Sequence, residues 1–184
     1  LSLSEVELHT DYALIISTNA GLWRYSIGDT IQFTQKKPYR FIISGRTKHH
    51  INAFGEELMI HNAEKALQQA CKLTNTEVSE YTAAPMHLAE GQKAYHEWII
   101  EFKEAPKDLS NFIYHFDNAL KSTNSDYEAK RYKNMVLEEP RIHIAAKGLF
   151  FKWMKQKGKL GGQNKVPRLS NSREYLDELI KMNS

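Results

Sequence analysis

The sequence predicts an α+β fold, in which a group of β-strands precedes a small unit of strands and helices. Two observations support this prediction. Residues 12–44 alternate between apolar and polar positions and are interrupted by the turns Asn19-Ala20-Gly21 and Lys36-Lys37-Pro38, a pattern typical of strands joined by turns. From residue 56 to residue 71 the apolar positions then change to helical spacing.

The individual elements follow from the local pattern. Strands are expected where the chain is β-branched or alternates: residues 12–18, 22–27, 30–34, 39–44, 77–84, 94–102 and 141–145. Helices are expected where apolar residues recur every three or four positions: residues 56–71, 106–120, the first half of 127–137, 148–155 and 172–181. Asp108 is a suitable N-cap for the second of these helices. The Gly28-Asp29 step separates two strands, residues 45–48 form a basic turn, and residues 158–167 contain too much glycine to be regular.

Size and composition favour a globular protein of one domain, or one domain with part of a neighbour. Of the 184 residues, 41% are hydrophobic and 26% are charged, which is ordinary for this class. No run of 18 apolar residues is present and the opening residues lack the pattern of a signal peptide. The single cysteine, Cys71, fits a reducing compartment and is expected in the core. We therefore expect a cytoplasmic protein, and a fragment of a longer chain because it starts without methionine.

The charge is modest in sum but uneven along the chain. The net charge is +3, and two stretches, residues 36–55 and 147–168, contain basic residues without any acidic one. Such stretches are either solvated surface or an electropositive rim for a polyanion. The charge pattern alone leaves both interpretations open.

Three residues have side chains that suit a nucleotide. The Asp29 carboxylate can accept hydrogen bonds from sugar hydroxyls, and the Arg46 guanidinium can bind phosphate or carboxylate oxygens. Lys165, in a glycine-rich loop, could neutralise a phosphate. Each has a plainer explanation, since Asp29 could be a turn residue, Arg46 and Lys48 could be charges at a hairpin tip, and Lys165 could be solvated. The histidines do not have the spacing of a metal site, so no metal ligand is predicted.

Several short motifs resemble those of a known family. LWRYSIGD at residues 22–29 and ISGRTK at residues 43–48 resemble two core motifs of the adenylate-forming enzymes. Within these, STNAGL at residues 17–22, Gly148-Leu149-Phe150, and QNKVPR at residues 163–168 resemble the auxin-responsive acyl acid–amido synthetases. Plant members of that family join amino acids to hormone carboxylates. The resemblance extends over nearly the whole chain.

The resemblance implies an architecture and a reaction. Residues 1–45 would be the last strands of a large N-terminal domain, and residues 46–184 a small mobile C-terminal domain with a mixed sheet and packed helices. The enzyme would use ATP to activate a carboxylate as acyl-AMP and would then conjugate the acyl group to an amino acid. Mg2+ would be bound mainly through the phosphates. The partners would be the enzyme's own N-terminal domain, a small carboxylic acid and an amino acid, without nucleic acid or membrane, and the fragment alone would be inactive.

The same resemblance implies roles for five residues. Asp29 would accept hydrogen bonds from the ribose hydroxyls, Arg46 would lie near the ribose or phosphate, and Tyr25 would also contact the nucleotide. Lys48 would lie at the hinge of the small domain. Lys165 would be the mobile catalytic lysine that bridges the α-phosphate and the acyl carboxylate, an electrostatic role.

The chain departs from the plant pattern at two places. It has Ser26 where the plant motif carries a second arginine, and it has Glu56-Glu57 where some plant members have a basic residue that contacts ATP. These differences bear on the phosphate side of Asp29 and on the contacts of the linker. They do not affect Lys165.

Three other functions compete with this interpretation. The acyl group could pass to a thiol such as coenzyme A rather than to an amine. The chain could be a basic RNA-binding α+β module, because residues 147–153 (KGLFFKW) resemble the aromatic strand of RNA-recognition domains. That alternative requires a strand with exposed aromatic rings, and a helix that buries Phe150 and Trp153 would contradict it. A domain used only for assembly is the third alternative.

Overall fold

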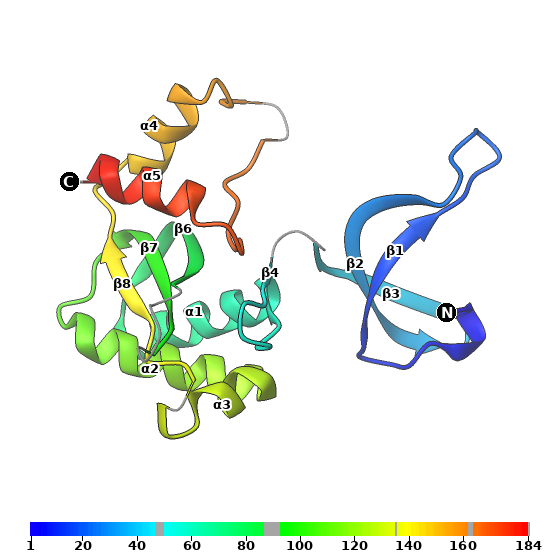
Figure 1. Ribbon diagram of the computed structural model, residues 1–184, viewed down its shortest axis with the longest axis horizontal. Helices are drawn as coiled ribbons and strands as arrows, with labels where there is room; N and C mark the ends of the chain where they lie inside the picture. Colours follow the sequence, from blue (N-terminus) through cyan, green and yellow to red (C-terminus); the bar gives the residue numbers. More distant parts are fainter. Residues whose placement is uncertain (47–49, 87–92, 135, 162–163, 184) are drawn as a thin grey trace. The chain divides into compact units, whose positions relative to one another are not determined.

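The computed structural model describes residues 1–46, 50–86, 93–134, 136–161 and 164–183 (Figure 1). The chain divides into two compact units, Leu1–His49 and His50–Ser184, and each is described by itself. The family resemblance implied a boundary between residues 45 and 46. The assignment of residues 1–45 to a larger N-terminal domain stays a prediction.

The first unit is a three-stranded antiparallel sheet in the order β1-β2-β3. Its elements are a 3-10 helix at Leu3–Glu5 and the strands β1 (Asp11–Ile16), β2 (Tyr25–Lys36) and β3 (Tyr39–Arg46). Val6 forms a small buried core with Ile31 and Phe33 of β2. The expected strands are therefore present, with two corrections. β2 is continuous through Gly28 and Asp29 and starts only at Tyr25, and β3 continues through Gly45 to Arg46, where a turn was predicted.

Gly28 and Asp29 belong to a bulge and do not separate two strands. The β1–β2 ladder pairs Ala13 with Thr30 and next Ile15 with Ser26, so three residues of β2 lie opposite a single residue of β1. Gly28 has φ 85°, a left-handed conformation that glycine adopts without steric cost. A bulge of this kind lets the strand continue while it redirects a side chain, and Asp29 is the residue that immediately follows.

The second unit is built around a mixed sheet in the order β6-β7-β8, with an antiparallel β6–β7 pair and a parallel β7–β8 pair. Its strands are β4 (His50–Ile51), β5 (Leu58–Met59), β6 (Glu77–Met86), β7 (Tyr95–Glu104) and β8 (Arg141–Ile144). Its helices are α1 (Ile60–Thr74), α2 (Leu109–Thr123), α3 (Ser125–Arg131), α4 (Leu149–Gln156) and α5 (Glu174–Asn183), with a 3-10 helix at Tyr132–Asn134. The predicted α+β class and the mixed sheet are confirmed.

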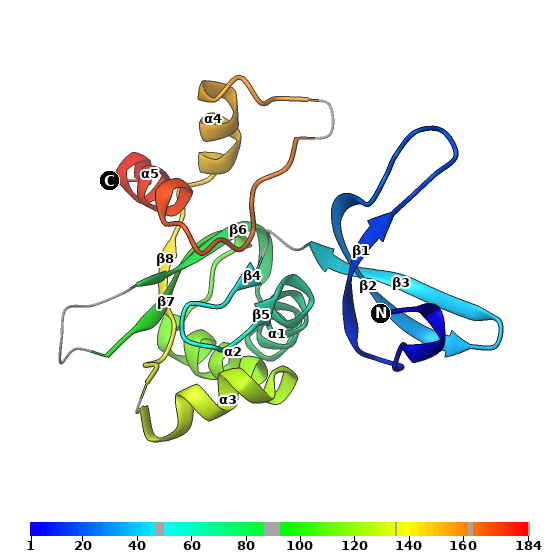
Figure 2. The same cartoon turned by 45° about the vertical axis from the view of Figure 1, so that its right-hand side comes forward.

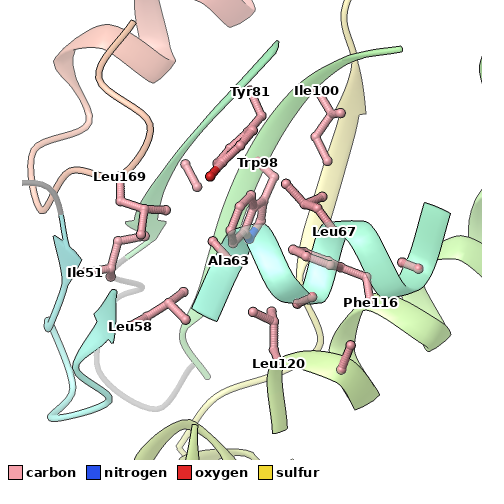
Figure 3. Packing of buried hydrophobic residues seen from close by; sticks show 14 of the residues in the cluster. Ile51, Leu58, Ala63, Leu67, Tyr81, Trp98, Ile100, Phe116, Leu120 and Leu169 are labelled. Carbon is pink, nitrogen blue, oxygen red and sulfur yellow. The ribbon is translucent and has the colours of Figure 1, made fainter. Parts of the chain in front are cut away.

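Helices cover both faces of this sheet (Figure 2). On one face, α1 and α2 pack against Trp98 and Ile100, and on the other, α4 and α5 pack against Ile99. Neighbouring residues of β7 thus point into two different cores, because successive side chains of a strand point to opposite faces. Trp98 is fully buried, and its ring meets that of Phe116 edge to face at 4.9 Å between centroids (Figure 3). Full burial of one large apolar side chain contributes roughly 1.5–3 kcal/mol, so these two cores stabilise the unit.

The helix starts show where the local sequence was sufficient to predict the structure. The predicted N-cap of α2 is confirmed, since the Asp108 carboxylate accepts a hydrogen bond from the Asn111 N–H at 3.1 Å. The predicted helix at residues 56–71 is wrong at its start, because Glu57 has φ 41° and the chain forms β5 before α1 begins at Ile60. α4 follows Gly148 as predicted and buries Phe150 and Trp153. This contradicts the RNA-binding alternative, which required those rings to be exposed on a strand.

The buried Asp117 carboxylate joins α2 to α3. It accepts hydrogen bonds from Arg131 Nε at 2.8 Å and Nη2 at 2.7 Å and from the Tyr127 hydroxyl at 2.9 Å, and it pairs with Lys121 Nζ at 3.0 Å. Burial by itself would raise the pKa of Asp117, but the hydrogen bonds from Arg131 and Lys121 hold that pKa below its ordinary value. The carboxylate is therefore charged in the folded protein at neutral pH.

We predict that Asp117→Asn destabilises the chain at neutral pH by about 3 kcal/mol, because it leaves the buried Arg131 guanidinium without its counter-charge. The pKa of Asp117 is lowered by folding. Its stabilisation is therefore complete above the unfolded pKa of about 3.9 and is lost as the pH falls through the folded value. The measurement is the free energy of unfolding, obtained from urea denaturation followed by tryptophan fluorescence at a series of pH values. In acid, this free energy should fall with decreasing pH in the wild type and should fall less steeply in the variant. Asp108→Asn is the control, since asparagine caps helices as well as aspartate does. Equal slopes for the wild type and Asp117→Asn would contradict the assignment.

Candidate functional site

Asp29 and Arg46 are neighbours in the first unit. The β2–β3 ladder pairs Asp29 with Arg46 and Thr30 with Gly45, and a second register shift follows at once, as Ile31 pairs with Ile43. Asp29 is thus flanked by irregularities on both sides, in the β1 ladder and in the β3 ladder. It is half-buried. Irregular pairing of this kind is common where strands present a side chain to a ligand.

Tyr25 lies at the start of the same strand, where it pairs with Ile16 of β1. Its side chain is half exposed, and Trp23, two residues earlier, is 82% exposed. The structure therefore brings Tyr25, Asp29 and Arg46 into one sheet. Lys48, the predicted hinge residue, lies outside the described residues.

Lys165 belongs to the second unit and is exposed. Of the glycine-rich stretch before it, the described residues 158–161 and 164 form neither helix nor strand, as predicted. From Val166 onward, by contrast, the chain is held closely. Val166 joins the core under α4 and α5, and Leu169 is fully buried in the core under α1 and α2, beside Ile51 (Figure 3).

Backbone hydrogen bonds attach this segment to the free edge of β6. The Ala83 N–H donates to the Arg168 carbonyl at 2.9 Å, and the Ser170 N–H donates to the Ala83 carbonyl at 3.1 Å, so that Leu169 forms a parallel bridge with Ala83. The Thr82 hydroxyl donates to the Pro167 carbonyl at 2.6 Å. Lys165 is therefore an exposed cation one residue before a segment that extends the sheet. We name residues 166–170 the docked segment.

A buried Glu56–His96 pair lies near the start of the second unit. His96 Nε2 lies 2.8 Å from a Glu56 carboxylate oxygen, and both side chains are completely buried. The same carboxylate accepts hydrogen bonds from the N–H groups of Phe54 at 2.7 Å and Ala53 at 3.3 Å. Burial by itself would raise the pKa of Glu56, but the hydrogen bonds from His96 and from backbone N–H groups hold that pKa below its ordinary value. Glu56 thus closes the loop between β4 and β5, while Glu57 is exposed.

A second carboxylate network lies on β7. Glu97 lies 2.7 Å from His143 Nε2 and accepts a hydrogen bond from Arg173 Nη2 at 2.6 Å, and Arg173 also pairs with Asp177 at 2.7 Å. Burial alone would raise the pKa of Glu97, but hydrogen bonds from His143 and Arg173 lower it. Further along β7, Glu101 accepts a hydrogen bond from the Gly148 N–H at 2.8 Å, at the start of α4.

Sequence reasoning missed these polar residues of β7. The sequence predicted a strand at residues 94–102 without a role for its polar residues, and the structure shows that β7 is central and is buried from Tyr95 to Phe102. A signal was available, because His96, Glu97 and Glu101 stand within an otherwise apolar strand, and buried charges occur almost only where they are paired.

Within the described part of the chain, no helix is long and apolar enough to cross a membrane. The same residues contain no cluster of three His, Cys, Asp or Glu side chains suited to a metal ion.

Comparison with known families identifies both units. The model of the GH3 family central domain matches residues 1–46, and that of the GH3 family C-terminal domain matches residues 61–174, more than half of the chain. The chain belongs to the GH3 family. The resemblance to the acyl acid–amido synthetases is thereby confirmed.

Two curated GH3 relatives from Arabidopsis thaliana match nearly the whole chain. Indole-3-acetic acid-amido synthetase GH3.4 is 25% identical over 183 residues, which covers 91% of this chain and 30% of the relative. Indole-3-acetic acid-amido synthetase GH3.10 is 28% identical over 188 residues, which covers 96% of this chain and 31% of the relative. The chain therefore spans about a third of the length of these synthetases.

Solved structures show the same fold. The GH3.15 acyl acid amido synthetase superposes with a TM-score of 0.74 at 20% identity, over 100% of this chain and 35% of that one. The complex of AtGH3.15 acyl acid amido synthetase with 2,4-DB gives a TM-score of 0.71 at 18% identity. The fold of the GH3 C-terminal region is thus present in this chain, whereas the roles of Asp29, Arg46, Tyr25, Lys48 and Lys165 stay predictions.

We predict that His96→Ala destabilises the protein by about 3 kcal/mol, because it removes a hydrogen-bond donor from a fully buried carboxylate. His143→Ala is the matched control. His143 contacts Glu97 in the same way, but its side chain is 41% exposed and Arg173 still holds the carboxylate, so the loss should stay below about 1 kcal/mol. Chemical denaturation of both variants provides the measurement. A loss in His96→Ala no greater than in His143→Ala would show that the Glu56–His96 pair does not hold the β4–β5 loop.

Proposed function

We propose that this chain is the C-terminal part of an ATP-dependent acyl acid–amido synthetase. A carboxylate attacks the α-phosphorus of ATP to give acyl-AMP and pyrophosphate, and the amine of an amino acid then attacks the acyl carbon to give an amide and AMP. The observation that supports this proposal is the extent of the family match, which covers residues 1–46 and 61–174. The match therefore includes the bulge that carries Asp29, and it also includes the segment that carries Lys165.

In this proposal the bulge in β2 forms the sugar end of the nucleotide site. The Asp29 carboxylate accepts hydrogen bonds from the ribose hydroxyls, because an ionised carboxylate is an acceptor only. Arg46, its register partner on β3, contributes a cation for ribose or phosphate oxygens. Tyr25, half exposed on the same strand, provides a ring surface and a hydroxyl for the nucleotide.

Lys165 stabilises the negative charge that develops as the carboxylate attacks phosphorus and pyrophosphate leaves. This role is electrostatic and requires a cation that is accessible and held in place. Lys165 is exposed, and the docked segment begins at the next residue. Its delivery depends on movement of the small domain about a hinge near Lys48, and the second half-reaction follows a rotation of that domain.

Mg2+ fits this chemistry as an ion bound mainly through the phosphates, since it needs few protein ligands when a nucleotide supplies oxygens. It would neutralise phosphate charge. The acceptor in the second step is proposed to be an amine and not a thiol, because the two curated relatives are amido synthetases by name.

The partner of the first unit is proposed to be the remainder of the synthetase's N-terminal portion. The core of this unit comprises three buried residues among those described. Three consecutive residues of the edge strand β3, Phe41, Ile42 and Ile43, are 51–68% exposed. Since successive side chains lie on opposite faces, both faces of β3 present apolar surface, which is typical of an interaction site.

We predict that Lys165→Ala in the full-length synthetase lowers carboxylate-dependent ATP–pyrophosphate exchange by at least about 100-fold, as expected for loss of a charge that stabilises the transition state. ATP affinity, measured by calorimetry, should change by less than about threefold, because the role belongs to the transition state. Lys159→Ala removes another exposed lysine from the same region and should leave exchange unchanged. Exchange at the wild-type rate in Lys165→Ala would refute the assignment.

We predict that Asp29→Ala weakens ATP binding by about tenfold or more, the effect of losing hydrogen bonds to a charged acceptor. Asp11→Ala is the matched control, since Asp11 is an exposed carboxylate on β1 of the same sheet. The measurement is calorimetric titration of the full-length protein with ATP. An unchanged affinity in Asp29→Ala would remove this residue from the nucleotide site.

A further inference from the structure

Arg168 ends the KVPR sequence that begins at Lys165, and its side chain reaches two other elements. Its guanidinium forms an ion pair with Glu64 of α1, and its Nε lies 3.4 Å from a carboxylate oxygen of Glu80 on β6. The same guanidinium lies over the ring of Tyr81, 5.3 Å from the centroid. One side chain therefore joins the docked segment to a helix and to a strand.

These contacts make Arg168 unsuited to bind substrate phosphate and well suited to fix the chain. Two carboxylates already balance its charge, and they lie on elements that are held by the core of the unit. Tyr81 is buried, and burial raises the pKa of its hydroxyl well above the ordinary value, so that the ring stays neutral beneath the cation. A planar guanidinium can pair in its plane and stack on its face at once, which an ammonium cannot do.

The backbone hydrogen bonds of the docked segment do not by themselves restrain its rotation about the edge of β6. The hydrogen bonds with Thr82 and Ala83 all run to one strand, β6, so they fix the register of the segment along that strand. The Arg168–Glu64 pair runs instead to α1. Together with the buried side chains of Val166 and Leu169, it restrains how the segment is turned about the strand edge, and hence the direction in which the chain leaves toward Lys165.

We propose that Arg168 is the positioning residue for Lys165: its simultaneous contacts with Glu64, Glu80 and Tyr81 orient the docked segment so that the lysine is presented in one direction. The inference rests on the proposed function, because it assigns Arg168 a role through Lys165. It goes beyond that function by naming a residue that does not touch substrate.

The test compares kinetic constants of the full-length synthetase in carboxylate-dependent ATP–pyrophosphate exchange. Arg168→Ala should lower kcat by about tenfold to a hundredfold, the range expected when a catalytic group is misplaced by a fraction of its reach. The KM for ATP should stay within about twofold, since the guanidinium of Arg168 is paired with Glu64 and Glu80 and is not proposed to bind the nucleotide. Arg168→Lys should recover only part of kcat, because it restores the charge without the fork and the stacking.

Arg141→Ala is the matched control for loss of an arginine of this type. Arg141 also stacks on a tyrosine, with its guanidinium 3.8 Å from the Tyr95 centroid, and it pairs with Glu138 at 3.6 Å. It lies on β8, at the opposite edge of the sheet from the docked segment. Its removal should leave kcat unchanged.

The decisive measurement is the double variant Lys165→Ala/Arg168→Ala. If Arg168 acts only through the lysine, the double variant should be no slower than Lys165→Ala alone, because there is no longer a lysine to orient. If the loss of kcat in the double variant equals the product of the losses in the two single variants, the inference is overturned. A raised KM with unchanged kcat in Arg168→Ala would also overturn it. If Lys165→Ala alone retains full exchange, the proposed function itself fails; if Lys165→Ala is inactive and Arg168→Ala is normal, only the positioning role fails.

Discussion

The burial of β7 on both faces is the constraint on which the second unit depends. A central strand covered by helices on each side strongly disfavours an unpaired charged side chain, because the cost of removing the charge from water is then not recovered. β7 nevertheless carries His96, Glu97 and Glu101. Each forms a hydrogen bond with a different peripheral element: His96 Nε2 with Glu56 of the β4–β5 loop, Glu97 with Arg173 just before α5, and Glu101 with the Gly148 N–H at the start of α4. The pairing required by burial thereby fixes the arrangement of the unit around its sheet.

The candidate catalytic lysine benefits from this rigidity without being part of it. The β6 edge of the sheet is paired with β7 on one side only, and the docked segment occupies the other side through Ala83. Leu169 and Val166 contribute to the cores on the two faces. The chain therefore passes from an irregular, glycine-rich stretch into a fully anchored one across a single residue. Such a junction combines an accessible cation with a defined origin, which is what electrostatic catalysis by a positioned group requires.

Local sequence determined most elements and little of the pairing between them. The α2 start at Asp108 and the α4 helix after Gly148 could be predicted, because caps and apolar spacing act within a few residues. The bulge at Gly28-Asp29 could not, since a Gly-Asp step is equally compatible with a turn and only the ladder with β1 distinguishes them. The same holds for Glu56, which was expected to begin a helix. Its carboxylate is buried because of His96, forty residues away in sequence. The family resemblance located Asp29 and Lys165 by motif, and only coordinates could reveal how Arg168 is held.

Charge along the sequence also differs from charge in space. Residues 147–168 contain seven basic residues and no acidic one, and this run favoured either a solvated face or a rim for polyanions. In the structure, acidic residues from other elements enter it: Glu178 of α5 pairs with Lys157 at 2.7 Å, and Glu64 and Glu80 pair with Arg168. Part of the apparent excess is therefore balanced locally, and exposed pairs of this kind add little to stability. Their effect is instead that Lys157 and Arg168 are paired within the protein and are less accessible to an anionic ligand. Binding of a phosphate in this region would then depend less on the total charge than on the position of an accessible lysine. The geometry around Lys165 would therefore matter more than the number of basic residues near it.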